Sequence, residues 1–112
     1  MAISPNAVQN IVTALTTQAR ISFTNVVDDI DQHVIPTMAS IAHSLTVIGG
    51  RLIDGIYTKD IADVEVAAQI DAAASVIVRF ANRVLKEIQD TINAVLSAVR
   101  DVVNTALGVA LL

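Results

Sequence analysis

The stretch from Asp60 to Leu107 contains no Gly and no Pro, and its apolar residues keep a helical spacing almost throughout. As one straight helix it would be roughly 70 Å long, at about 1.5 Å per residue. A compact domain of this size has a radius of gyration of only about 13 Å. The stretch therefore either breaks and folds back on itself, or the protein is a long rod that assembles with partners.

The composition contains more apolar side chains than a small core needs. Hydrophobic residues make up 54% of the 112 residues and charged residues 16%, against averages of about 45–50% and about 25%. The excess is aliphatic, because the chain has two Phe, one Tyr and no Trp. We expect a single helical domain, residues 1–112, with a second apolar surface for a ligand, a lipid or a subunit.

The first helix is predicted from Ser4-Pro5, because a hydroxyl cap followed by Pro at the first helical position is a typical start. Apolar residues then recur every three or four positions over Val8–Val34, which predicts one long amphipathic helix. We expect Pro36 to end or kink this helix, since the residue before a proline avoids the helical region.

The second helix is predicted over Met38–Ile56, again from apolar residues on one face. Gly49-Gly50 lies inside it and is expected to loosen or bend it, at roughly 1 kcal/mol per glycine. The glycines also allow another helix or a ligand to approach the backbone closely. A loop is expected over Gly55–Lys59.

The third segment is expected to begin at a cap formed by Asp60 or Asp63 and to stop at Gly108. If it breaks, Gln89-Asp90-Thr91 is the preferred point, because Asp90 is able to cap a following helix. Its apolar stripe is wider than the stripe of a two-stranded coiled coil, in which two of every seven residues are apolar. This width favours an all-α antiparallel bundle of three to five helices, compact or elongated, and we expect it to form a homo-oligomer. The main alternative is a helical hairpin with an unbroken third segment.

The sequence carries no strong signal for chemistry. Asp29 and His33 share a helix face, but further ligands at suitable spacing are missing, so we predict no metal site and no cofactor. His43 lies beside an apolar face. A partly exposed position without a chemical role is the simpler interpretation of this histidine than a catalytic or pH-sensing role. Gly49-Gly50-Arg51 lacks the G-K-[ST] element of a phosphate loop. We therefore expect a non-enzymatic protein.

Charge and hydropathy exclude two kinds of partner. The net charge is −4, and the seven Lys and Arg residues are scattered, which argues against nucleic acid. No apolar run reaches the roughly 18 residues of a spanning helix. No signal peptide precedes Ser4, so we expect a soluble protein and leave open secretion after removal of a signal peptide.

Asp28-Asp29-Ile30, Leu45, Gly49-Gly50 and Ile70, within a Thr/Ser/Ala-rich and Lys-poor chain, resemble fungal surface proteins that bind lipids or hydrophobic surfaces. The resemblance implies a helical bundle with a Gly-rich break between helices. It covers barely half of the chain and includes no diagnostic motif, so we assign no family from it.

The excess of apolar residues carries the functional prediction. We expect the protein to bind a hydrophobic ligand, such as a fatty acid or similar lipid, or a hydrophobic surface. The alternative is a homo-oligomeric scaffold or a partner-helix interaction protein. The apolar site residues are predicted to be Phe23, Val26, Ile77, Phe80, Val84 and Ile88, all facing inward, with Gly49 and Gly50 shaping access. The apolar tail residues Val109, Leu111 and Leu112 are predicted to form a subunit interface.

Overall fold

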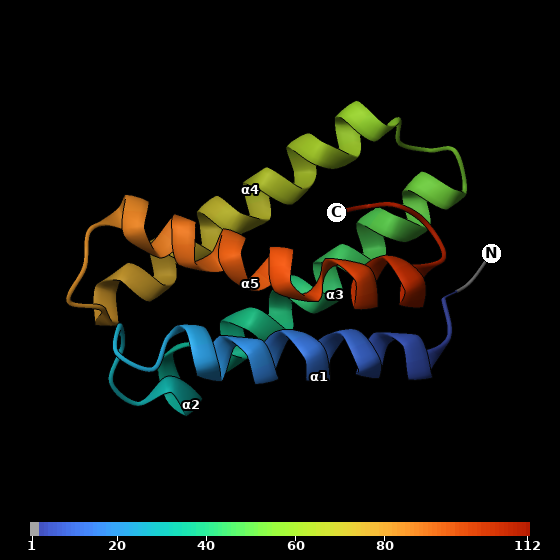
Figure 1. Ribbon diagram of the computed structural model, residues 1–112. Coiled ribbons are helices and arrows are strands. Elements are labelled where there is room, and N and C mark those ends of the chain that lie inside the picture. Colours follow the sequence, from blue (N-terminus) through green and yellow to red (C-terminus); the bar gives the residue numbers. More distant parts are fainter. Residues whose placement is uncertain (1–2) are drawn as a thin grey trace.

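The computed structural model describes residues 3–112, and within that range the protein is all-α and compact (Figure 1). The long helices are α1 (Pro5–Ser22), α3 (Ile35–Ile53), α4 (Lys59–Ile77) and α5 (Leu85–Leu107). Two short elements join them, α2 (Ile30–His33) and the 3-10 turn η1 (Val78–Phe80). The radius of gyration is 13.5 Å, so the long Gly- and Pro-free stretch is folded back and does not form a rod.

Helix α1 begins as predicted but ends earlier. Ser4 caps it by accepting a hydrogen bond from the backbone N–H of Ala7 at 3.2 Å. The prediction of one helix as far as Val34 is wrong, because the chain leaves the helix at Phe23, whose side chain is completely buried. Asp29 then adopts a left-handed backbone, with φ of 49°, a conformation that Asp tolerates better than most residues.

Pro36 lies at the start of a helix and not at the end of one. It occupies the first turn of α3, where a proline removes no helical hydrogen bond and its fixed φ suits the helix. The predicted helix boundary at this proline exists, because α2 ends at His33 and α3 begins at Ile35. The helix that ends there is the short α2 and not the predicted long one, which has already ended at Ser22.

Helix α4 begins at a different cap from the predicted Asp60 or Asp63. The hydroxyl of Thr58 accepts a hydrogen bond from the backbone N–H of Ile61 at 3.3 Å. Asp60 instead lies in the first turn, where its negative charge interacts favourably with the helix dipole.

The long stretch breaks at residues 78–84 and not at Gln89-Asp90-Thr91, which lies inside α5. Ala81 and Val84 have extended backbones, and Ala81 forms an isolated antiparallel bridge with Val27. The break thus coincides with a contact between residues more than fifty positions apart. No glycine or proline marks it in the sequence.

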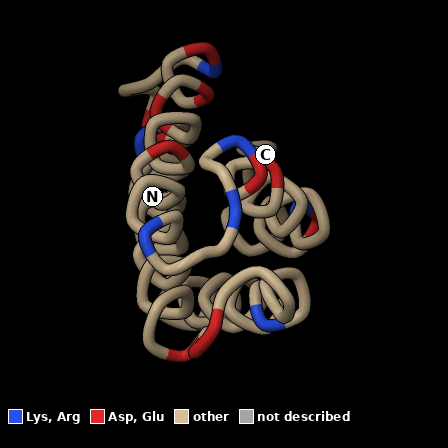
Figure 2. The backbone as a smooth tube through the Cα atoms, turned by 90° about the vertical axis from the view of Figure 1, so that its left-hand side faces the viewer, with Lys and Arg blue, Asp and Glu red and all other residues tan. Residues whose placement is uncertain are grey.

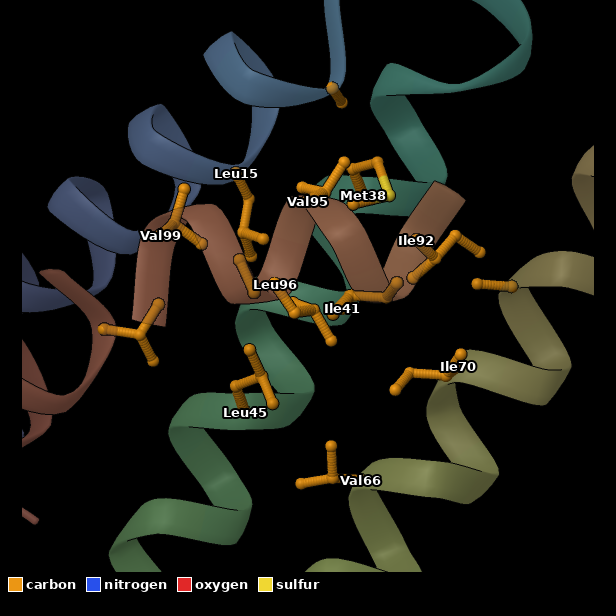
Figure 3. Packing of buried hydrophobic residues seen from close by; sticks show 14 of the residues in the cluster. Leu15, Met38, Ile41, Leu45, Val66, Ile70, Ile92, Val95, Leu96 and Val99 are labelled. Carbon is orange, nitrogen blue, oxygen red and sulfur yellow. The ribbon is translucent and has the colours of Figure 1, made fainter. Parts of the chain in front are cut away.

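Helix α3 contacts each of the other long helices, and α1 and α4 lie on opposite sides of the molecule (Figure 1). Leu15, Met38, Ile70 and Leu96, one from each long helix, belong to the buried aliphatic cluster and turn toward the same interior (Figure 3). No charged or polar residue is buried among residues 3–112, so this core is held by apolar packing, which is aliphatic apart from Phe23 and Met38.

Helix α3 continues through Gly49-Gly50 without interruption, and the expected loosening or bend there stays a prediction. The expectation of a close approach is confirmed at Gly49, which is buried against Leu107 of α5. A Cβ atom at Gly49 would lie 2.9 Å from Cδ1 of Leu107, whereas one at Gly50 would lie 3.9 Å from the nearest atom, Cδ1 of Ile3. Gly49 therefore sets how closely α3 and α5 pack at this end of the molecule.

This difference in available space predicts different effects of a Gly→Ala substitution at the two positions on the free energy of unfolding. Gly50→Ala should raise the free energy of unfolding by about 0.5–1 kcal/mol, because alanine favours the helix and finds room. Gly49→Ala should not raise the free energy of unfolding, because Leu107 must move out of a packed position and this cost offsets the gain in helix propensity. Urea denaturation of both variants measures the difference. Equal gains at the two positions would contradict the close packing of Leu107 on Gly49.

Candidate functional site

The structure places the six predicted apolar site residues at different depths. Phe23, Ile77 and Ile88 are completely buried within the aliphatic cluster. Val26 is half-buried and packs against that cluster. These side chains contribute to the packed core, and ligand binding by them stays a prediction.

Phe80 and Val84 do not face inward as predicted, because they lie in the break between α4 and α5 and not on a continuous helix. Their exposed fractions are 45% and 63%. Phe80 stacks on the ring of His33, with 3.9 Å between the ring centroids. Phe80 and Val26 also line a hollow of 330 Å³ at this end of the molecule.

The apolar tail folds back on its own chain. Leu111 is only 1% exposed, and its carbonyl oxygen accepts a hydrogen bond from Nζ of Lys59 at 2.8 Å. The side chain of Asn104 bonds the backbone of both Leu111 and Leu112. A subunit contact through Leu111 would therefore require the tail to leave the core. The predicted interface of Val109, Leu111 and Leu112 stays a prediction.

Helix α4 is apolar on two faces. Its inner face packs against α3 and α5, whereas its outer face is exposed to solvent. We define the outer face of α4 as the exposed residues that recur every three or four positions along it: Ile61, Val64, Ala68, Ala72 and Val76. The exposed fractions of Ile61, Val64 and Val76 are 45%, 68% and 45%.

The sequence pattern of α4 indicates this outer face, but the prediction of site residues did not include it. The polar residues of α4 are distributed around the helix and do not form one continuous polar face, whereas a surface helix normally carries its polar residues opposite its apolar stripe. The predicted seam of the third segment counted only its inward stripe. The outer face of α4 is therefore a candidate interaction surface.

Two hollows lie where α3 meets α4. One, of 290 Å³, is lined in part by Val47, Tyr57 and Glu65, and the other, of 210 Å³, by Ala72 and Val76 of the outer face. The hydroxyl of Ser44 donates to Oε1 of Gln69 at 3.1 Å between them. The outer face of α4 thus continues into a shallow seam beside α3.

A larger groove, of 720 Å³, lies between α1 and α5. Val99 is buried in its floor, and Ala14 and Ala106 are half-buried there. Exposed Thr residues, Asn10 and Asp101 form its rim. This groove is open along the surface, and none of the predicted apolar site residues lines it.

Titratable residues do not gather into a chemical centre. Among residues 3–112, no group of three or more His, Cys, Asp or Glu side chains is placed to hold a metal ion. Asp29 caps α2 by accepting a hydrogen bond from the backbone N–H of Gln32. Lys and Arg residues appear as short separate segments along the backbone in the view of Figure 2, with no continuous basic track.

Comparison with known proteins adds no assignment. Neither the protein-family models nor the curated proteins nor the solved structures give a match to this chain. Within residues 3–112, no helix combines the length and the apolar character needed to cross a bilayer.

The buried tail predicts that Leu111 acts within the chain. Leu111→Ala should lower the free energy of unfolding by about 2–3 kcal/mol, as for other buried leucines, while Leu112→Ala, at a half-buried position, should cost less. Chemical denaturation measures the stability, and sedimentation velocity measures the mass. A fall in native mass with unchanged stability would instead support the predicted subunit interface.

Proposed function

We propose that this protein is a non-enzymatic antiparallel helical bundle that binds a hydrophobic ligand or surface through the outer face of α4. The observation that carries the proposal is that α4 presents apolar side chains to the core and to solvent at once. Contiguous exposed apolar surface of this kind marks interaction sites in soluble proteins.

The charges around the outer face favour an uncharged target. Asp60, Asp63, Glu65 and Asp71 all lie on α4, and Lys59 is the one basic residue of that helix. Amphipathic helices that bind anionic membranes carry Lys and Arg on the polar face. Because α4 is acidic, a neutral lipid phase or another uncharged hydrophobic surface suits it better than an anionic bilayer.

The expected strength of one contact is modest. Complete burial of a Val or Ile side chain is worth roughly 1.5–3 kcal/mol, and Ile61, Val64 and Val76 have about half of their surface left to bury. Together they would contribute on the order of 3 kcal/mol. A contact of that size suits adsorption to an extended surface, where many molecules bind side by side.

A second candidate function, homo-oligomer formation, has a specific observation in its favour. The outer face is symmetric about its middle, with Ala68 and Ala72 at the centre and Val64 and Val76 on either side. A two-fold axis between two α4 helices would pair Val64 of one with Val76 of the other. Self-complementary surfaces of this type form isologous dimers.

The test replaces two outer-face residues by a polar residue that helices accept. Val64→Gln with Val76→Gln should lower the affinity for a neutral alkyl-coated surface about tenfold or more, because roughly 1–2 kcal/mol of burial is lost. A quartz crystal microbalance measures adsorption, and circular dichroism checks that helicity is unchanged.

The matched control is Ile21→Gln with Ile56→Gln, which removes two aliphatic residues of similar exposure away from the outer face. This variant should adsorb like the original protein. Unchanged adsorption of the Val64 and Val76 variant would rule out the outer face. The second candidate function would be established if sedimentation velocity showed a dimer that only the Val64 and Val76 variant loses, while adsorption stayed unchanged.

A further inference from the structure

We propose that the groove between α1 and α5 binds an uncharged single-chain amphiphile, an alkyl chain that ends in a hydroxyl or ester head group. This site is distinct from the outer face of α4, because α1 and α4 lie on opposite sides of the molecule (Figure 1). The inference goes beyond the proposed function and stands or falls independently of it.

The floor of the groove is apolar and built from small residues. Val99 is buried, Ala14 and Ala106 are half-buried, and Val102 is 47% exposed. Alanines on both helices leave a trough where larger side chains would fill the space between α1 and α5. Its volume of 720 Å³ lies within the range of roughly 300–1,000 Å³ that is typical of small-molecule sites.

The groove follows the two helices lengthwise. On α1 its lining extends from Asn10 to Gln18, and on α5 from Val99 to Ala106. At about 1.5 Å per residue, these stretches are roughly 10–12 Å long. An open trough of this length with an apolar floor accommodates a linear alkyl chain of medium length.

The rim supplies uncharged hydrogen-bonding groups. Thr13, Thr17 and Thr105 contribute hydroxyls, and Asn10 and Gln18 contribute amides. These groups both donate and accept hydrogen bonds, so they suit a hydroxyl or ester head group lying at the edge of the trough.

The charge of the lining selects against a carboxylate. Asp101 is the one charged side chain among the described residues that line the groove. Arg20 is the one basic residue of α1 and is paired with Asp31. A fatty acid anion would therefore meet a like charge with no lining cation to offset it. An alcohol or a monoacylglycerol of the same chain length has no such penalty.

The test compares 1-decanol with decanoate at pH 7.5 by NMR titration of the full chain. Decanoate is kept below its critical micelle concentration, and decanol is kept below its solubility limit. Decanol should shift the resonances of Ala14, Val99 and Val102, with an affinity about tenfold higher than that of decanoate. Asp101→Asn should strengthen decanoate binding and so reduce the ratio of the two affinities severalfold. The control Asp90→Asn makes the same charge change elsewhere on α5 and should leave this ratio unchanged.

Two further variants separate this site from the outer face of α4. Ala14→Phe should abolish decanol binding by filling the trough, whereas Ala67→Phe, at an exposed position of α4 outside the lining, should leave it intact. Val64→Gln with Val76→Gln should also leave it intact. Equal affinities for the two ligands, or decanol shifts confined to α4, would overturn the proposal. If the resonances of the groove residues shifted with rising protein concentration in the absence of ligand, a second copy of the protein would occupy the groove. That result would also overturn the proposal.

Discussion

The fold depends on the reversal between α4 and α5, which turns one long apolar segment into two helices. Without it, the residues on either side of residues 78–84 would lie along a single axis and would have no common core. With it, Ile77 and Ile88 are both completely buried. The bridge between Val27 and Ala81 and the ring stack of His33 on Phe80 join this reversal to the first third of the chain.

The second constraint is the small size of the side chains that fill the core. With three aromatic residues in the chain, close packing has to come from short distances between helices and not from large side chains. Gly49 against Leu107 is the clearest instance. The same composition leaves Ala14 and Ala106 facing a trough between α1 and α5, and Ala68 and Ala72 in the middle of an exposed stripe on α4. Both candidate sites therefore follow from a chain rich in alanine and β-branched residues.

Prediction from the sequence succeeded where the signal was local. The Ser4-Pro5 start of α1, the stop at Gly108 and the all-α class follow from caps, backbone preferences and periodicity, and the structure contains each of them. It failed where a distant contact decided the outcome. At the end of α1 the chain turns and Phe23 packs into the core. At the break over residues 78–84 the extended backbone of Ala81 pairs with Val27. For that reason Phe80 and Val84, predicted to face inward, are exposed.

The sequence by itself determined that this protein is helical, that its core is aliphatic and that its apolar residues exceed the needs of one helix face. Each of these depends on composition and on spacing within a few turns. Only the tertiary structure decided which apolar residues were left in solvent. Ile70 and Val64 lie on the same helix and have similar side chains, yet one is 9% exposed and the other 68%. The difference arises because α3 and α5 cover one face of α4 and no element of the described chain covers the other.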